Sequence, residues 1–125
     1  MASDSYGEGA PQAGTAMVVT FMLDGLELYA LNGGPGFPFT EAVSLYVKAE
    51  TQDEIDDLWT RLTDGGEPGR CGWLQDRYGF SWQIVPPVLV ELLSDPDPAR
   101  AGRVMQAMLG MGKLDISALR AAADG

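Results

Sequence analysis

The chain has 125 residues, of which 46% are hydrophobic, so it can bury a core, and composition favours one domain over global disorder. Its formal net charge is −10. Nucleic acid and anionic membranes are therefore excluded as expected partners, because both require a basic patch. An acidic docking site would also account for this charge, but a well-solvated surface is the simpler explanation.

Scarce and missing residue types narrow the chemistry further. The single Cys cannot form an internal disulfide, which suits a reducing compartment. The chain has no His, so the commonest metal ligand and the commonest general base are both lacking. No apolar run reaches the ~18 residues that a membrane helix needs, and the N-terminus shows no signal-peptide pattern. We therefore expect a cytoplasmic protein.

The N-terminal third predicts an arm, a hairpin and a loop. Residues 1–15 are small and polar, and we expect them to form a flexible or extended arm. The apolar run of residues 16–23 and the alternating run of residues 26–31 predict two antiparallel strands around a type I′ turn at Asp24-Gly25. The Gly-rich loop of residues 32–40 lacks the Lys and the following Ser/Thr-bearing helix that phosphate binding would require.

A strand and a helix are predicted next. Residues 42–48 alternate between apolar and polar, as a half-buried strand does. Thr51 and Glu54 form a capping-box pattern at the start of a helix that extends to Thr63. The Asp residues of its first turns could bind a metal, but they are better explained as a solvated face at the positive end of the helix dipole.

The segment CGWLQDRYGFSWQIVPP, from Cys71 to Pro87, predicts a second hairpin around which the remaining chain is organised. Its flanks are rich in aromatic and β-branched residues, and residues 76–79 have the composition of a tight turn. Trp73 and Trp82 lie on either side of this turn, so we expect them to meet across the hairpin.

The C-terminal part predicts helices. Residues 88–93 form a short apolar turn or helix, Asp97 can cap a helix with Pro98 in its first position, and Asp115 can cap a last helix of residues 116–122. The middle helix has a Met-rich side, which indicates core or dimer contact more than an adaptable binding surface. That side consists of Val104, Met105, Met108, Leu109 and Met111.

Three stretches carry a resemblance to a known family. They are LDGLELYALNGGPGFPFTEAVSLYV, then ETQDEIDDLWTRLTDGGEPGRCGWLQDRYGFSWQIVP, then LLSDPDPARAGRVMQAML. Together they resemble the PhnB-like branch of the vicinal oxygen chelate (glyoxalase/bleomycin resistance/dioxygenase) superfamily. The resemblance implies an α+β fold, with a βαβββ-type mixed curved sheet in a glyoxalase-like domain of residues 16–93. Residues 94–125 would form a C-terminal helical extension, packed on the domain or on a dimer partner.

The resemblance also implies two βαβββ modules, of which the first lacks its opening strand and helix here. A sheet without an edge strand exposes backbone and apolar surface. We therefore expect a second copy to cover the gap in a homodimer, with exchanged elements as one form of it. Some members of the branch are labelled ubiquinone-pathway methyltransferases, but the sequence has no Gly-rich fingerprint for a methyl-donor nucleotide.

Metal-using relatives imply particular ligand positions, and none of them holds an ionised ligand in this sequence. Four residues after the turn glycines stand Gln83 and Tyr29, and the position of a ligand His falls near Ala42. A Gln oxygen is a weak, neutral ligand, and the residue is equally explained as a polar group on a sheet face. We therefore expect no bound metal and no cofactor.

The concave sheet face supplies candidate residues for binding an unidentified small molecule, since aromatic rings with a few polar groups suit such a pocket. Alternatively, the rings fill the cup or a dimer interface. The candidates are Tyr29, Tyr46, Trp73, Trp82 and Gln83.

No catalytic residue is assigned. Cys71 has no His to activate it, and Arg70 beside it is a weak substitute, so an inert thiol is the better explanation. Glu41 and Glu50 are conceivable acid–base residues, but most surface Glu side chains are merely solvated.

Three functions remain open. The first is a metal-free small-molecule-binding homodimer, which an open aromatic pocket around Trp82 and Gln83 would favour. The second is a vicinal-oxygen-chelate-type enzyme, lyase- or dioxygenase-like, which a metal bound at Gln83 with a partner-chain carboxylate would favour. The third is a truncated structural paralogue without activity, which a filled cup would favour.

Overall fold

The computed structural model describes residues 16–125, so the arm predicted for residues 1–15 lies outside the described residues. The chain divides into two compact units, one reaching to Pro38 and the other running from Phe39 to Gly125. No helix in the described part of the chain is long and apolar enough to cross a membrane.

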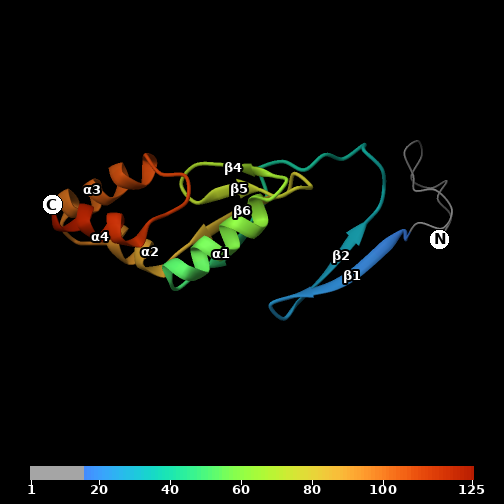
Figure 1. Ribbon diagram of the computed structural model, residues 1–125, viewed down its shortest axis with the longest axis horizontal. Coiled ribbons are helices and arrows are strands. Elements are labelled where there is room, and N and C mark those ends of the chain that lie inside the picture. The colour runs from blue at the N-terminus through green and yellow to red at the C-terminus, as the bar shows by residue number, and fades with distance from the viewer. Residues whose placement is uncertain (1–15) are drawn as a thin grey trace. The chain divides into compact units, whose positions relative to one another are not determined.

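The first unit contains an antiparallel hairpin of β1 (Val18–Leu23) and β2 (Leu26–Leu31) (Figure 1). Both central residues of its turn have positive φ, 50° at Asp24 and 82° at Gly25. A type I′ turn requires this conformation at both positions, so the predicted turn is confirmed.

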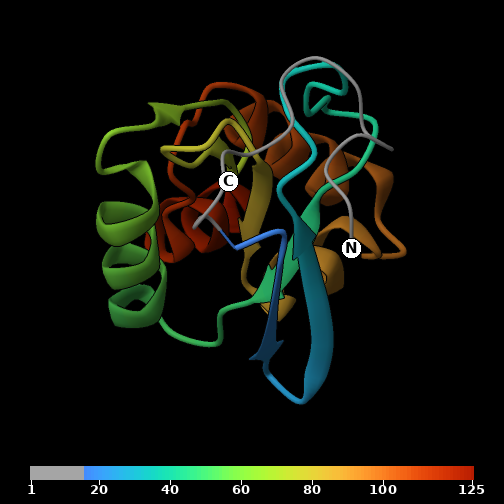
Figure 2. The same cartoon turned by 90° about the vertical axis from the view of Figure 1, so that its right-hand side faces the viewer.

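The second unit is built on a four-stranded mixed sheet with the order β3-β6-β5-β4 (Figures 1 and 2). β3 runs parallel to β6, whereas the β6–β5 and β5–β4 pairs are antiparallel. This is the βαβββ-type α+β arrangement that the resemblance implied. Its elements are β3 (Leu45–Lys48), α1 (Gln52–Thr63), β4 (Glu67–Pro68), β5 (Trp73–Gln75) and β6 (Ser81–Val85).

The start of α1 follows the predicted capping pattern with one difference. The Thr51 side chain accepts a hydrogen bond from the Glu54 backbone N–H at 3.2 Å, as expected of an N-cap. The Glu54 carboxylate, however, accepts from the N–H of Glu50, one residue before the cap, at 3.0 Å. The reciprocal pair of bonds therefore spans one residue more than the usual capping box.

The loop between β5 and β6 is organised by Asp76. Its carboxylate accepts hydrogen bonds from the backbone N–H groups of Tyr78 (2.9 Å) and Phe80 (3.1 Å) and from Trp82 Nε1 (2.9 Å). Its backbone carbonyl accepts from the N–H of Gly79, whose φ of 84° favours glycine. Asp76 alone therefore accepts hydrogen bonds from four residues of the loop and the strand after it.

The expectation that the two tryptophans meet across the hairpin is wrong. Trp73 lies opposite Gln83, and Trp82 lies opposite Leu74. The strands end at Gln75 and Ser81, so the loop has one residue more than the predicted four-residue turn, and a one-residue change of register exchanges the two faces of a strand. The tryptophans therefore lie on opposite faces of the sheet.

One face of the sheet packs against α1 and forms the first core (Figure 2). Ile55 of α1 and Leu74 and Ile84 of the sheet are buried there together with Ala49, and Trp82 packs at its edge. We call the other side of the sheet, opposite α1, the open face.

A second core lies among the C-terminal helices, α2 (Pro87–Leu93), α3 (Pro98–Leu109) and α4 (Ile116–Asp124), which form the cluster at the C-terminal end in Figure 1. Asp97 and Asp115 cap α3 and α4 as predicted, accepting from the N–H groups of Ala99 and Ala118. The buried residues of this core are Val85, Leu89, Val104, Leu114, Leu119 and Ala123.

The Met-rich side of α3 is only partly core. Val104 is fully buried in the second core, and Met108 and Met111 are partly buried and pack against this core. Met105 and Leu109 remain 40% and 48% exposed, so the expected core contact does not extend to them.

Candidate small-molecule site on the open face of the sheet

Strand register places three of the predicted site residues in one line across the open face. Tyr46 of β3 lies opposite Gln83 of β6, and Gln83 lies opposite Trp73 of β5. Residues directly opposite one another on paired strands share a face. Residues that are distant in the sequence thereby occupy neighbouring strand positions, and we call this line the Tyr46–Gln83–Trp73 row.

The row combines aromatic surface with one oriented amide. Tyr46 is 47% exposed, and the other two side chains are half-buried. Gln83 Nε2 donates to Ser44 Oγ at 3.0 Å, which fixes the orientation of the amide and leaves its carbonyl oxygen as the acceptor that the row offers. Two rings flanking a fixed amide can bind an organic molecule by stacking and by one directed hydrogen bond.

A cavity of about 430 Å³ adjoins the row at Trp73. Alternation along the strands puts Gln75 and Ser81, which lie opposite each other, on the same face as Trp73. The volume lies within the range of small-molecule sites. The residues that line the cavity include Glu41, Glu67, Arg70, Trp73, Gln75 and Ser81.

A glycine shapes one wall of this cavity. The N–H of Gly69 donates to the backbone carbonyl of Trp73 at 2.9 Å, where the chain folds back after β4. A Cβ at Gly69 would stand 2.7 Å from that carbonyl oxygen, which is too close for any side chain. Glycine is therefore required for the close approach that holds Trp73 in place.

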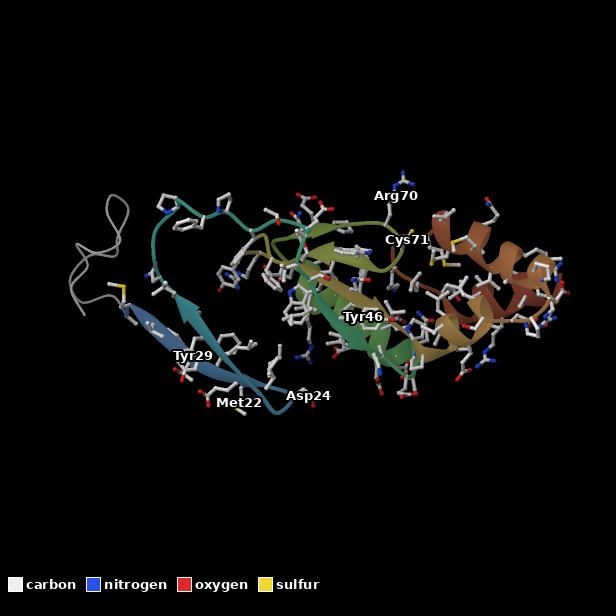
Figure 3. All side chains as sticks on the ribbon, turned by 180° about the vertical axis from the view of Figure 1, so that it is seen from behind. Met22, Asp24, Tyr29, Tyr46, Arg70 and Cys71 are labelled. Atoms are coloured by element: carbon white, nitrogen blue, oxygen red, sulfur yellow. The ribbon has the colours of Figure 1, made fainter. Side chains whose placement is uncertain are left out.

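The polar groups around the cavity differ in exposure. Glu41 and Glu67 present solvent-exposed carboxylates. Arg70 lies in the loop before β5, and Figure 3 shows its side chain extending away from the ribbon. Ser81, in contrast, is 1% exposed, and its hydroxyl has no hydrogen-bond partner among residues 16–125. A buried polar atom of this kind costs stability unless something else bonds to it.

The two other predicted site residues are not in this row. Trp82 faces α1, with its Nε1 bonded to Asp76, so it is not part of the open face. Tyr29 belongs to the hairpin of the first unit (Figure 3), and its side chain is 68% exposed. Ser81 was not among the residues predicted from the sequence. The period of two along β6 from Gln83 was the signal that could have indicated it.

Comparison with known proteins shows which family the chain belongs to. The family model described as 3-demethylubiquinone-9 3-methyltransferase matches residues 1–85. The chain belongs to this PhnB-like family of the glyoxalase superfamily. A solved structure of a PhnB protein from Bacillus cereus, which carries the same methyltransferase name, shares 36% sequence identity with it. The match covers 65% of this chain and 73% of that one, with a TM-score of 0.56. No curated protein matches the chain.

The ligand positions implied by metal-using relatives do not fit a divalent metal in this PhnB-like chain. Ala42 has no donor atom in its side chain, and Gln83 offers a neutral amide that is already bonded to Ser44. Among residues 16–125, no three His, Cys, Asp or Glu side chains are grouped so that they could hold a metal ion. Divalent metals prefer ionised oxygen or imidazole ligands, so this donor set is unsuitable.

The backbone of Cys71 in this PhnB-like chain is fixed by hydrogen bonds to a distant segment. Its backbone lies in the left-handed region, with φ of 58°, and its N–H donates to the carbonyl of Met111 at 2.8 Å. The next residue, Gly72, donates to Gly112 in the same way at 2.9 Å. These bonds join the loop before β5 (Figure 3) to the segment after α3, so the conformation of this loop is explained by backbone pairing.

Proposed function

We propose that this PhnB-like protein is a homodimer that binds a small molecule on the open face of its sheet without a metal ion. The observation that carries the proposal is the Tyr46–Gln83–Trp73 row beside a cavity of about 430 Å³. Aromatic surface with a few directed polar groups is the usual lining of a small-molecule site. A truncated paralogue with a filled face would have no such cavity.

The metal-free part of the proposal is supported by the chemistry of the donor atoms. The resemblance implies ligand positions at Gln83 and near Ala42, and neither of these two side chains can supply an anion or an imidazole. A lyase- or dioxygenase-like reaction would need ligands from elsewhere, such as a carboxylate of a second copy. Binding requires only the groups that the row and cavity present.

Methyl transfer, which the family name describes, is less well supported by this chain. Nucleotide-type methyl donors are commonly held where a strand leads through a Gly-rich turn into a helix. Here β3 leads into α1 through Ala49, Glu50 and Thr51, without a glycine. We therefore retain binding as the proposed function.

The homodimer is supported by the hairpin of the first unit. Along one of its faces, every residue is apolar, and Val19, Phe21 and Leu26 are 51%, 43% and 55% exposed. A two-stranded hairpin is marginal in water unless its apolar surface is covered. A second copy of the chain would cover it. The residues of this apolar hairpin face are Val19, Phe21, Leu23, Leu26, Leu28 and Ala30.

Native mass spectrometry of the purified protein, with and without added Mn²⁺ or Zn²⁺, tests oligomeric state and metal content together. We expect a dimer whose mass does not change after metal addition and buffer exchange. A dimer that retains one metal ion per chain would contradict metal-free binding and return the enzyme hypothesis to first place. A monomer at micromolar concentration would contradict the dimer.

A further inference from the structure

We infer that β3 pairs antiparallel with β3 of a second copy, and that the second copy thereby contributes Lys48 to the candidate site. This inference rests on the homodimer of the proposed function and adds an interface and a site residue to it. β3 is the last strand on its side of the four-stranded sheet, and no strand among residues 16–125 pairs with its outer edge. An unpaired strand edge is a template on which another chain can add a strand.

The hydrogen bonds of β3 show which backbone groups are free to pair. The Ala49 N–H donates to the carbonyl of Val85 in β6 at 3.0 Å. Backbone groups alternate in direction along a strand, so those of Val47 also point toward β6, and those of Tyr46 and Lys48 point away from it. The outer edge of β3 therefore offers two N–H donors and two carbonyl acceptors.

One two-fold register satisfies all four of these groups. With Val47 opposite Val47 of the second copy, Tyr46 of each chain lies opposite Lys48 of the other, and each such pair exchanges two backbone hydrogen bonds. A register centred on Tyr46 would leave Lys48 opposite Ser44, which precedes the strand. A register centred on Lys48 would place two ammonium groups directly opposite each other, which is destabilising.

The side chains at the edge fit the register centred on Val47. Tyr46 and Lys48 are both exposed, Tyr46 by 47%. A lysine on an edge strand usually prevents indiscriminate pairing. In this register, however, each ammonium group lies beside the Tyr46 ring of the other chain, where a cation–π contact is favourable. Each chain carries a net charge of −10, so a cation at the contact also reduces the repulsion between copies.

The edge of β3 sets the alignment of the two copies, whereas the apolar hairpin face supplies affinity. A strand of four residues buries too little surface by itself, because a stable interface takes about 800 Å² from each partner. The hairpin exposes the apolar area that the edge lacks, since Val19, Phe21 and Leu26 are each at least 43% exposed. Backbone pairing adds the directed bonds that fix one register.

This pairing extends the Tyr46–Gln83–Trp73 row by one strand. Opposite residues of paired strands share a face, so Lys48 of the second copy lies next to Tyr46 on the open face, one strand spacing of about 4.8 Å away. The row by itself offers two rings and an amide. The second copy adds an ammonium group to it, so the candidate site is complete only in the dimer.

Cysteine cross-linking of the full chain tests the register, with Cys71→Ser removing the native thiol. Val47→Cys places two thiols at the two-fold axis with Cα atoms about 4.5 Å apart, which a disulfide can bridge. We expect mild oxidation to convert most of this variant into a covalent dimer on a non-reducing gel. Tyr46→Cys is the register control, because its two copies are offset by about 7 Å along the strands. Val90→Cys, at a residue of α2 that is 54% exposed, measures random collision.

Amide hydrogen exchange of the unmodified protein, followed by ¹H–¹⁵N NMR, gives a second measurement that needs no variant. The N–H groups of Tyr46 and Lys48 donate across the interface. We therefore expect them to exchange more than about tenfold more slowly than the same residues in an unstructured peptide.

The outcomes separate this inference from the proposed homodimer. A protein that is dimeric by light scattering, but whose Val47→Cys variant cross-links no faster than Val90→Cys, would overturn the pairing of β3 and leave the dimer intact. Preferential cross-linking of Tyr46→Cys would overturn the register, and with it the place of Lys48 in the site. Unprotected amides at Tyr46 and Lys48 would overturn the pairing whatever the variants do. A monomer would overturn both the inference and the dimer.

Discussion

The Gln52 side chain joins the first residue of α1 to the backbone at the start of α4. Its Oε1 accepts a hydrogen bond from the Ile116 N–H at 2.8 Å, and its Nε2 donates to the Leu114 carbonyl at 3.0 Å. Leu114 is fully buried in the core of the C-terminal helices. One amide therefore satisfies two backbone groups of a segment 62 to 64 residues away and links the two cores.

Replacement of Gln52 should lower the stability of the whole second unit. Gln52→Ala leaves the Ile116 N–H and the Leu114 carbonyl without their partner, and we expect a loss of about 1–3 kcal/mol in the free energy of unfolding. Gln52→Glu keeps the acceptor for Ile116 but places a carboxylate beside the Leu114 carbonyl, so it should not restore the loss. Urea denaturation followed by circular dichroism measures both.

Gln106→Ala is the control for this change, because Gln106 is an exposed residue of α3. It should change the free energy of unfolding by no more than about 0.5 kcal/mol. A Gln52→Ala protein as stable as this control would show that the two backbone groups find water instead.

The loop between β5 and β6 should depend on Asp76 in a similar way. Asp76→Asn keeps one oxygen for the N–H groups of Tyr78 and Phe80 but can turn an NH₂ group toward Trp82 Nε1. We expect a loss of about 1–2 kcal/mol and altered Trp fluorescence, because Trp82 loses its partner. Unfolding followed by fluorescence measures the free energy of unfolding of this variant. The control is Asp53→Asn, because Asp53 is an exposed residue in the first turn of α1. Equal stability of the two variants would be the contrary result.

Local patterns predicted those parts of the fold that depend on nearby residues. The type I′ turn at Asp24-Gly25 and the caps at Thr51, Asp97 and Asp115 are all set by interactions between residues close together along the chain. The loop after β5 differs, because the Asp76 side chain also binds Phe80 and Trp82 and extends the loop by one residue. Turn composition carries no sign of that extra residue.

For the same reason, the sequence could place the residues of the candidate site only in part. Tyr46, Trp73 and Gln83 were identified from residue type, and the register places them in one row. The single additional loop residue moves Trp82 to the opposite face, which no residue type could indicate. The period of two along β6 could have placed Ser81 on the face of Gln83, but its burial depends on neighbours that are distant in sequence.

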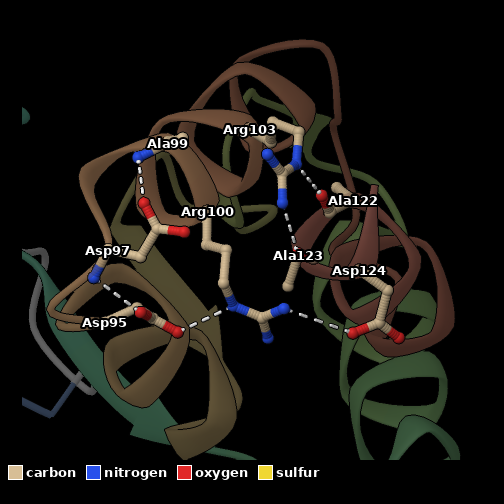
Figure 4. Close-up of polar contacts among 8 residues, drawn as sticks. All are labelled: Asp95, Asp97, Ala99, Arg100, Arg103, Ala122, Ala123 and Asp124. Carbon is tan, nitrogen blue, oxygen red and sulfur yellow. Dashed lines mark hydrogen bonds and ion pairs between the residues drawn. The ribbon is translucent and has the colours of Figure 1, made fainter.

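Stability should fall in acid partly through Asp95. The Asp97 backbone N–H and then the Arg100 side chain lower the pKa of Asp95 from its ordinary value of 3.8 (Figure 4). A carboxyl with a lowered pKa in the folded state stabilises the protein above its unfolded-state pKa, and the contribution is lost as pH falls through the folded-state value. Lys113 and then Gln52 lower the pKa of Asp56 with the same sign.

Asp95→Asn tests this contribution. We expect the variant to be less stable than the unmodified protein at pH 7. The difference between them should shrink as the pH falls below the ordinary carboxyl pKa and then through the lower folded-state pKa of Asp95. Thermal melts over this pH range measure the difference, and Glu91→Gln serves as the control at an exposed carboxylate. A difference in stability that stays constant down to the lowest pH would show that the charge of Asp95 does not contribute to stability.

Ser81→Ala should stabilise the protein in the absence of any ligand. The Ser81 hydroxyl is buried without a partner among residues 16–125, so its removal relieves a desolvation cost and leaves only a small void. We expect a gain of about 1 kcal/mol in the free energy of unfolding. A loss of stability measured by urea denaturation would mean that the hydroxyl is bonded in solution, for example to water.

The dimer should depend on the apolar hairpin face of the first unit. Phe21 lies opposite Leu28 on that face and is 43% exposed. In a symmetric dimer, a substitution at Phe21 removes the contact of this side chain from both chains. Phe21→Asp removes ~0.6–1.3 kcal/mol of further burial per chain, the share of full burial that the exposed part of the ring allows, and adds a carboxylate that resists desolvation, so we expect the dimer to dissociate. Phe37→Asp is the matched control, because Phe37 lies in the loop after β2 and is 91% exposed.

Light scattering coupled to gel filtration over a range of concentrations should show monomers for Phe21→Asp and dimers for Phe37→Asp. The two variants add the same charge, so a difference between them reports the position of the interface rather than general repulsion. If both variants remained dimeric at every concentration, the interface would have to lie away from this hairpin, because no two-fold contact through its apolar face could tolerate two buried carboxylates.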